Sequence, residues 1–389
     1  MRIIEELYKQ NPWWEGSFPY KFIKRDKYLD ILKKNLNNRD IIFLIGLRRV
    51  GKTTIFKMMI NYLLKRVDPK HILYVSLDSY NLEDYSIHEI LEEYRKEHRL
   101  KREEKIFLFF DEVAHKEHFA QELKNLYDFE NVKIYASSSS SSIIKSRKSY
   151  LIGRERIIEV LPLDFNEYLV FKSVKIKKSD SHLFKKYFED YMMDGGMPEY
   201  VLTGDVSYLN SLIEDIIMKD VALLHNVKDL NIIKDYFKIL MERVGKRLSI
   251  NKITKIVGIS PDTSRRYLSY FMDTFLIYSV DKCGKLNERI KSPKKIYIVD
   301  VGIRNFITGF KDKGSVFENL VFLKIKDKNP CYIYEDGVEI DFRVDKTLIE
   351  VKYGREIQER QAKLFNKFPE SEYRKLVIKD VVDFLSLSI

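Results

Sequence analysis

Cysteine is almost missing from this chain of 389 residues, which contains only Cys283 and Cys331. The two stand far apart in the sequence and form no C-x-x-C pair, so the sequence predicts neither a disulfide framework nor a structural zinc site. The seven histidines form no cluster. His115 and His118 make a lone His-x-x-His without a third ligand nearby, which is weak support for a metal site.

Long apolar runs are missing as well. No stretch approaches the roughly 18 continuous apolar residues of a membrane span, and the N-terminal sequence, Met-Arg-Ile-Ile-Glu-Glu, is not that of a signal peptide. Hydrophobic residues make up 45% and charged residues 33% of the chain, which excludes global disorder. We therefore expect a cytoplasmic protein without a membrane partner, long enough for two or three domains.

What the chain does contain is a complete G-x-x-x-x-G-K-[ST] motif at residues 46–53. It lies between an apolar run, 41–45, and a helix-like stretch, 55–65, which is the strand–loop–helix context of a phosphate-binding loop and disfavours a chance glycine-rich turn. We expect Lys52 to reach the β- and γ-phosphates and the Thr53 hydroxyl to ligate Mg²⁺. The predicted nucleotide-binding residues are Gly46, Leu47, Arg48, Arg49, Val50, Gly51, Lys52, Thr53 and Thr54.

An acidic pair follows a second apolar run. Residues 106–110 are all apolar, as in a central parallel strand, and Asp111 and Glu112 come directly after them. Asp111 is the expected Mg²⁺ ligand and Glu112 the general base that polarises the attacking water. The alternative, that the pair only caps the next helix, is disfavoured by the phosphate loop upstream. The pair favours hydrolysis over passive binding.

A serine run ends another predicted strand. Residues 132–135 lead through Ala136 into six serines, Ser137 to Ser142. Ser137 or Ser138 is the candidate for the polar group that orients water against the γ-phosphate. A flexible loop is an equal alternative for the later serines.

Two further strands, at 72–77 and 156–161, complete an α/β alternation that predicts a parallel sheet. Arg154 lies near the edge of this sheet. It could stabilise γ-phosphate charge in its own chain or in a neighbouring subunit, and a surface salt bridge is an equal alternative.

Residues 249–272 predict a helix, a turn and a second helix. Apolar residues recur at helical spacing up to Val257, Ser260 is a natural N-cap, and Pro261 suits the first helical position. A β-like segment at 274–280 follows, as in a winged helix. If this unit binds DNA, the second helix presents Thr263, Arg265 and Arg266; packing against another domain or protein is the equal alternative. The net charge of +11 moderately favours nucleic acid, although the charge is diffuse.

The last hundred residues hold a second candidate site. Residues 339–344 and 347–352 predict a β-hairpin that carries Asp341 and the Glu350-x-Lys352 pair, the spacing found in restriction-endonuclease-like folds. Two carboxylates there would hold a divalent cation over the scissile phosphate, and the lysine would help to activate water. Glu318 and Gln361 match supporting positions in that fold. Exposed charge pairs are the alternative.

These motifs, in this order, resemble the prokaryotic AAA-type ATPases, common in archaea, that carry a C-terminal restriction-endonuclease-like domain. The resemblance also rests on Gly153-Arg154 and on residues 161–168, 195–199 and 297–302. It implies ATP as the nucleotide. The family usually has a glycine before its serines where this chain has Ser137, which leaves open the serine that senses the γ-phosphate.

We therefore predict an α/β P-loop ATPase core with a helical lid, a winged helix and a C-terminal α/β nuclease-like domain, using ATP and Mg²⁺ and acting on DNA. The alternative is a nucleotide-dependent switch or assembly protein that binds partners and never cuts DNA. A homo-oligomer and a protein partner stay open. The predicted boundaries are 1–35 for an N-terminal segment, 36–165 for the ATPase core, 166–230 for the lid, 231–290 for the winged helix and 291–389 for the nuclease-like domain.

Overall fold

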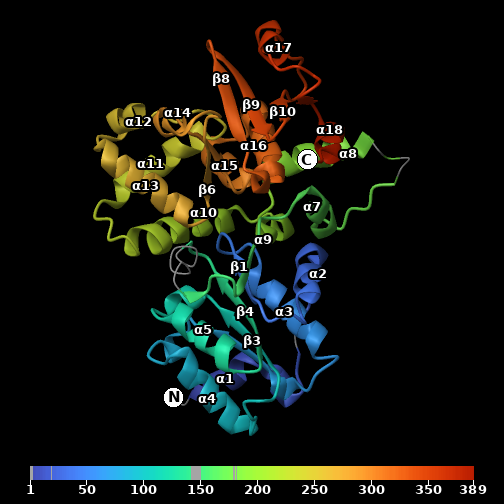
Figure 1. Ribbon diagram of the computed structural model, residues 1–389, viewed down its shortest axis with the longest axis vertical. Helices are drawn as coiled ribbons and strands as arrows, with labels where there is room; N and C mark the ends of the chain where they lie inside the picture. The colour runs from blue at the N-terminus through green and yellow to red at the C-terminus, as the bar shows by residue number, and fades with distance from the viewer. Residues whose placement is uncertain (1–2, 19, 142–149, 178–179, 181) are drawn as a thin grey trace. The chain divides into compact units, whose positions relative to one another are not determined.

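A computed structural model describes residues 3–18, 20–141, 150–177, 180 and 182–389 (Figure 1). The chain forms two compact units, the first made of residues 1–161 and 273–275 and the second of residues 162–272 and 276–389. Ser142, the last of the predicted serine run, lies outside the described residues. In the ranges described, no helix has the length and apolar character that a membrane crossing requires.

The first unit alternates strands and helices, as predicted. Its elements are α1 (Ile3–Gln10), α2 (Asp26–Lys34), β1 (Ile41–Ile45), α3 (Lys52–Leu63), β2 (Ile72–Ser76), α4 (Ile87–His98), β3 (Ile106–Asp111), α5 (Phe119–Phe129), β4 (Val132–Ser138) and β5 (Glu155–Glu159). The strands form one parallel sheet in the order β2-β3-β4-β1-β5. This order places the carboxyl ends of β1, β4 and β3 side by side.

Both faces of this sheet are covered, which explains why its strands are apolar without alternation. Residues of α1, α4 and α5 pack in one core with every second residue of β1 and β3. On the opposite face Phe56 of α3 meets Phe109 of β3, which stacks on Tyr135 of β4 at 4.8 Å. Strand β4 runs three residues beyond the predicted 132–135 because Ala136, Ser137 and Ser138 pair with β1.

The N-terminal segment is anchored on the sheet. The indole nitrogens of Trp13 and Trp14 both donate to the carbonyl oxygen of Ile72, at 3.2 and 3.0 Å. Asn11 bonds the Tyr74 backbone in both directions. These contacts tie the segment to the start of β2.

The second unit begins with helices. They are α7 (Phe165–Phe171), α8 (His182–Asp194), α9 (Pro198–Thr203), α10 (Val206–Asp215), a π-helix (Ile216–Leu223), α11 (Leu230–Arg243), α12 (Ile250–Val257) and α13 (Pro261–Asp273). The α-helix α10 continues directly into the π-helical stretch. The predicted helix pair is present as α12 and α13, and the Ser260 hydroxyl accepts from the Thr263 backbone N–H at 3.1 Å, as an N-cap does.

The rest of the second unit mixes helices with two small sheets. Its elements are β6 (Ile277–Val280), α14 (Leu286–Lys291), β7 (Lys295–Ile298), α15 (Val301–Thr308), α16 (Lys313–Ile325), β8 (Cys331–Glu335), β9 (Val338–Val344), β10 (Thr347–Val351), α17 (Glu359–Asn366), β11 (Arg374–Ile378) and α18 (Val381–Ser386). β6 and β7 pair antiparallel, and the other sheet has the order β11-β10-β9-β8. The hairpin predicted from residue 339 to 352 is β9–β10.

Two glycine-containing segments of this unit lock together. The carboxylate of Asp300 accepts from the Gly196 backbone N–H at 2.6 Å and from that of Ile303 at 3.1 Å. A Cβ on Gly196 would overlap the carbonyl of Leu163, and one on Gly302 would overlap that of Asp194. Backbone therefore approaches backbone too closely for any side chain, which accounts for glycine at both positions.

The cysteine prediction is wrong. Cys283 and Cys331 form a disulfide, with their Cα atoms 5.1 Å apart, although 48 residues separate them in sequence. The fold brings them together because Lys282 bridges to Tyr332, next to the cysteines, and the Cys283 N–H donates to the Tyr332 carbonyl. The disulfide ties the segment after β6 to the first residue of β8.

Candidate functional site

The phosphate loop is shaped by glycine and held by an arginine. Gly46 and Gly51 both have positive φ, 139° and 99°. A Cβ on Gly46 would overlap the Val160 carbonyl. Arg25 donates to the carbonyls of Val50, at 2.8 Å, and Leu161, at 2.9 Å. Arg25 thus fixes the loop from the N-terminal segment, a role that its sequence neighbourhood did not signal.

Lys52 lies at the first position of α3 and folds back over this loop. Its Nζ donates to the carbonyls of Gly46, at 3.0 Å, and Leu47, at 3.2 Å, and lies 3.6 Å from Glu112 Oε1. The lysine is buried. Its ammonium is therefore held beside the loop by neutral carbonyls and one more distant carboxylate.

Asp111 is the centre of a hydroxyl cluster. Thr53 donates to Asp111 Oδ2 at 2.5 Å and Tyr74 to the same oxygen at 2.9 Å, while Ser137 donates to Oδ1. Burial, and then the charge of Glu112, raises the pKa of Asp111 despite the donated hydrogen bonds. Thr53 and Asp111, the predicted magnesium ligands, are thus in direct contact.

Glu112 has a different environment. Its Oε2 accepts from both the backbone N–H and the hydroxyl of Ser139, at 2.9 and 3.0 Å. Burial alone would raise the pKa of Glu112, but the Lys52 ammonium and the two bonds from Ser139 outweigh burial and lower it. Glu112 has a φ of 54°, a strained conformation of the kind that occurs at functional sites.

Alternate serines face opposite sides of the chain, as in a strand: Ser137 and Ser139 face the acidic pair, and Ser138 does not. Ser137 contacts Asp111 and accepts from the Glu112 N–H at 3.0 Å, and Ser139 holds Glu112. Ser138 instead donates to the Ser140 carbonyl. Of the two predicted candidates, only Ser137 faces the acidic pair, and the contribution of Ser139 was missed because the later serines resembled a loop.

The expectation that Arg154 acts on the phosphate site of its own chain is wrong. Arg154 precedes β5 and bonds to Ile41 at the start of β1, whereas the phosphate loop follows the end of β1. Since these strands are parallel, the arginine and the loop lie at opposite edges of the sheet. Arg154 pairs with Asp128 at 3.1 Å, as in the salt-bridge alternative. A role in a neighbouring subunit stays a prediction.

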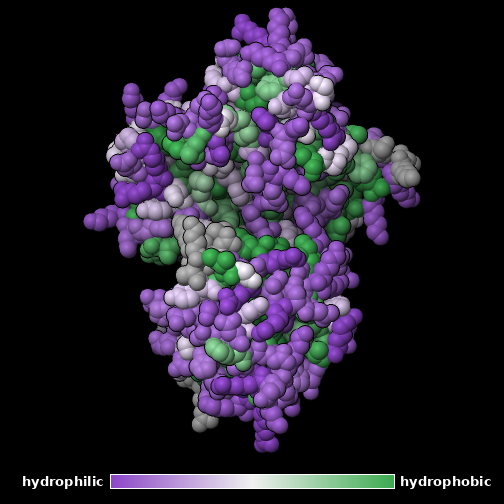
Figure 2. All heavy atoms as spheres, in the orientation of Figure 1, coloured by the Kyte–Doolittle hydropathy of each residue, from purple (hydrophilic) through white to green (hydrophobic). Residues whose placement is uncertain are grey.

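The candidate DNA-contacting residues lie in the first half of α13. Arg265 and Arg266 are exposed and Thr263 is half-buried. Arg265 pairs with Asp262 at 2.7 Å, while Ser264 and Phe271 face the core. Hydrophilic side chains predominate on the face of the protein in Figure 2. The arginines are therefore available to a partner, whichever kind it is.

The predicted nuclease-like residues come together in the second unit. Asp341 accepts from the Val351 N–H at 2.9 Å through Oδ2, and Glu350 Oε2 accepts from the Asp341 N–H at 3.3 Å. Lys352 contacts Glu350 Oε1, which also accepts from Gln361 at 2.6 Å. Burial, and then the charge of Asp341, raises the pKa of Glu350.

Lys295 was missed, although it joins this group. Its Nζ lies 2.7 Å from Glu318 Oε1, 2.6 Å from Glu339 Oε1 and 3.2 Å from Asp341 Oδ1. Lys295 belongs to no motif, and the chain has 69 basic residues, so no signal in the sequence singled it out. We call Lys295, Glu318, Glu339, Asp341, Glu350 and Lys352 the carboxylate–lysine cluster.

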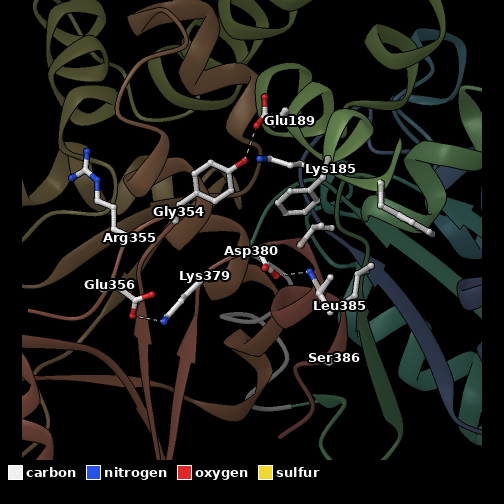
Figure 3. A pocket seen from close by; sticks show the side chains of 14 residues that line it. Lys185, Glu189, Gly354, Arg355, Glu356, Lys379, Asp380, Leu385 and Ser386 are labelled. Carbon is white, nitrogen blue, oxygen red and sulfur yellow. Dashed lines mark hydrogen bonds and ion pairs between the residues drawn. The ribbon is translucent and has the colours of Figure 1, made fainter. Parts of the chain in front are cut away.

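A large cavity opens elsewhere in the second unit (Figure 3). It has a volume of about 990 Å³ and lies between α8, the segment after β10 and α18. Phe188, Val381 and Tyr353 line it, and the Tyr353 hydroxyl donates to Glu189 at 3.2 Å. Lys379 pairs with Glu356 at its rim. None of the predicted site residues lines this cavity.

Comparisons with known proteins agree with the first site. A family model described as AAA domain matches residues 38–169, and one described as a domain of unknown function (DUF8612) matches residues 185–314. The uncharacterised protein MJ1544 of Methanocaldococcus jannaschii is 31% identical over 373 residues, covering 89% of this chain and 81% of that protein. An uncharacterised protein of Haemophilus influenzae is 27% identical, covering 92% and 93%.

Among solved structures, the Walker-type ATPase PABY2304 of Pyrococcus abyssi is similar over 74% of this chain and 96% of its own, with 15% identity and a TM-score of 0.47.

Proposed function

This chain belongs to the family of the Methanocaldococcus jannaschii protein MJ1544 and is an AAA-type P-loop ATPase, and from this premise we propose that it couples Mg²⁺-dependent ATP hydrolysis to DNA binding. The observation that carries the proposal is the meeting of the loop, the acidic strand and the serine strand at one edge of the sheet. Thr53 contacts Asp111, and Lys52 lies 3.6 Å from Glu112.

The groups present fit a magnesium–nucleotide complex. Thr53 Oγ1 and Asp111 Oδ2 are 2.5 Å apart and are both oxygen donors of the kind that Mg²⁺ prefers. Lys52 and the loop amides that follow β1 are the groups that would hold the phosphates. Bound Mg²⁺–ATP would supply the γ-phosphoryl group and neutralise part of its charge.

The two oxygens of Glu112 have distinct roles in this proposal. Oε2 is fixed by Ser139, so it orients the carboxylate. Oε1 faces Lys52 and is the oxygen that takes a proton from the attacking water. The lowered pKa of Glu112 keeps it ionised and ready to accept that proton. The Ser137 hydroxyl contacts both the Asp111 carboxylate and the Glu112 backbone N–H, so it fixes their relative positions.

DNA binding rests on the second unit. Three consecutive helices, α11, α12 and α13, followed by the antiparallel pair β6–β7, support a winged helix. Exposed Arg265 and Arg266 on α13 are suited to phosphate or base contacts. Residues 166–230 as a lid, a homo-oligomer and Arg154 acting across subunits remain parts of the same proposal.

The test measures ATP hydrolysis with and without duplex DNA. We expect DNA to stimulate the wild type, and R265A/R266A to lose the stimulation while keeping its basal rate. The control K9A/K96A removes the same charge from exposed positions of the first unit, where both side chains are more than half exposed, and should be stimulated like the wild type. Equal stimulation of R265A/R266A would contradict the DNA role.

A second candidate function is that of a switch whose nuclease-like domain recognises a partner without cutting. The saturation of the carboxylate–lysine cluster favours it, since both Asp341 and Glu350 already have partners on each oxygen. Incubation with Mn²⁺ and linear or branched DNA separates the candidates. Cleavage that disappears in D341A supports a nuclease; its absence in the wild type supports the switch.

A further inference from the structure

Lys295 is an ammonium enclosed by carboxylates. Its side chain is 1% exposed, and its Nζ lies within 3.2 Å of oxygens from Glu318, Glu339 and Asp341. An ammonium has three N–H donors, so these three acceptors can use all of them. The lysine comes from β7, while its partners come from α16 and β9.

The partners of Lys295 are themselves held in place. The Tyr297 hydroxyl donates to Glu318 Oε1 at 2.6 Å, and Arg247 lies 3.2 Å from Glu339 Oε2. In the described part of the chain, no three His, Cys, Asp or Glu side chains are grouped as a metal site. The carboxylates of this region are grouped around an ammonium instead.

The other side of Asp341, toward Glu350 and Gln361, has no ammonium of Lys295 and offers a position for a cation. Gln361 donates to Glu350 at 2.6 Å, yet its own Oε1 is buried and has no hydrogen-bond partner among the residues that the structure describes. The oxygen of an amide that already contacts the Glu350 carboxylate through its nitrogen is a suitable ligand for a hard divalent cation. This orphaned oxygen distinguishes the Asp341–Glu350 side of the cluster from the Glu318–Glu339 side.

We propose that Lys295 stands where a second divalent cation would lie, so that the nuclease-like domain accepts a single divalent cation, at Asp341, Glu350 and Gln361. The inference rests on the nuclease-like cation site that the sequence predicts at Asp341 and Glu350, the alternative to the non-cutting switch in the proposed function, and adds its stoichiometry. In two-metal sites the cations lie about 4 Å apart and share a carboxylate. Here Asp341 is the shared carboxylate, and the fixed ammonium takes one of the two places.

Charge supports one cation. The four carboxylates Glu318, Glu339, Asp341 and Glu350 face three cationic side chains, Lys295, Lys352 and Arg247. Counted with all four carboxylates ionised, as they would be with a cation bound, a single divalent ion would bring the group from one net negative charge to one net positive charge. A second would have to lie against the Lys295 ammonium, and like charges at that distance repel strongly where water is excluded.

The test counts Mn²⁺ by equilibrium dialysis of the full chain without nucleotide. Every protein carries D111N, which removes the metal ligand of the ATPase site. We expect one Mn²⁺ per chain in this background, two after K295A, one after the charge-conserving K295R, and a loss of the single ion after D341N. A K295A protein that still binds one ion, or a K295R protein that binds two, would overturn the inference.

Two further outcomes are decisive. No bound Mn²⁺ in the D111N background would remove the nuclease-like cation site at Asp341 and Glu350, and the stoichiometry with it, and would leave the ATPase proposal untouched, whereas a wrong count in K295A removes only the stoichiometry. If K295A is unfolded in EDTA, millimolar Mn²⁺ should restore the circular dichroism of the D111N protein, because the ion replaces the ammonium. A protein that stays unfolded in Mn²⁺ would contradict the proposal.

Discussion

The phosphate-loop site and the carboxylate–lysine cluster are both built from lysines and acidic residues, but they distribute their interactions differently. In the first, Lys52 rests on two backbone carbonyls and keeps 3.6 Å from its nearest described carboxylate. In the second, Lys295 contacts three carboxylates within 3.2 Å. The first ammonium can turn to an incoming anion at little cost, whereas the second already has its anions.

The difference teaches that a motif does not by itself say whether a site is poised for a ligand. Neutral carbonyls compete weakly with a triphosphate for an ammonium, so Lys52 is available. A buried ion pair, by contrast, is costly to break because each partner left alone is an unpaired charge in a poorly polar interior. The first site should therefore reveal itself in turnover and the second in stability.

The largest effect is expected on turnover. E112Q removes the proton acceptor and should lower the kcat for ATP hydrolysis by about 100-fold to 10,000-fold. Nucleotide affinity should change little, because Lys52 and the loop remain. Steady-state ATPase assays and titration with a fluorescent ATP analogue measure the two quantities. E117Q, the same change at an exposed position nearby, is the control, and a kcat of E112Q near that of E117Q would refute the assignment of the base.

The comparison of the two lysines predicts a difference in unfolding free energy. K295A should destabilise the second unit by about 3–5 kcal/mol in metal-free buffer, because it leaves three carboxylates without their ammonium. K52A should cost less, about 1 kcal/mol, since it removes bonds to two neutral carbonyls and one longer contact with Glu112, which Ser139 still holds. Denaturant unfolding followed by circular dichroism measures both.

The two tryptophans, Trp13 and Trp14, both belong to the first unit, so their fluorescence reports that unit alone. K295A should shift the dichroism transition and leave the tryptophan transition in place. Equal losses in K52A and K295A would abolish the contrast between the sites.

A third prediction extends the comparison to pH, because the second unit buries another carboxylate. Burial raises the pKa of Asp300 to about 6, from 3.8, although backbone N–H groups oppose the shift. A raised pKa means that the folded state holds the proton more tightly, so this contribution to stability is present below pH 4 and is lost as pH rises through 6. The loss should reach about 3 kcal/mol at pH 7.

The measurement subtracts D300N, which does not titrate. The unfolding free energy of the wild type minus that of D300N should fall as pH rises from 4 to 7. Carboxylates that do not interact with Asp300 contribute equally to both proteins and cancel. A difference that is flat with pH would show that Asp300 keeps an ordinary pKa in the folded protein.

The features that the sequence predicted well are local ones. The strand at 41–45, the loop and α3 are contiguous, and the acidic pair follows its strand directly, so periodicity and one motif suffice. The hairpin that carries Asp341 and Glu350 is local in the same sense. Parallel pairing then brought the ends of β1, β4 and β3 together, as expected.

The features that were missed depend on contacts between distant segments. Arg25 reaches carbonyls 25 and 136 residues away, and Lys295 reaches carboxylates 44 and 46 residues away. The disulfide spans 48 residues. Arg154 was misplaced because it precedes β5. A strand parallel to β1 begins at the edge of the sheet opposite to the phosphate loop, and the spacing along the chain does not reveal this. Such relations follow from topology, which composition and spacing do not contain.

The smallest effect compares two tyrosines that serve the two sites. Tyr74 donates to Asp111 at 2.9 Å and Tyr297 to Glu318 at 2.6 Å. Y74F should cost about 1 kcal/mol or less, because Thr53 and Ser137 still donate to Asp111. Y297F should cost about 2 kcal/mol, since Glu318 then depends on Lys295 alone among its described partners. The same two-probe unfolding assay applies, and a larger loss in Y74F than in Y297F would mean that the hydroxyls around Asp111 form a closed network like that around Lys295.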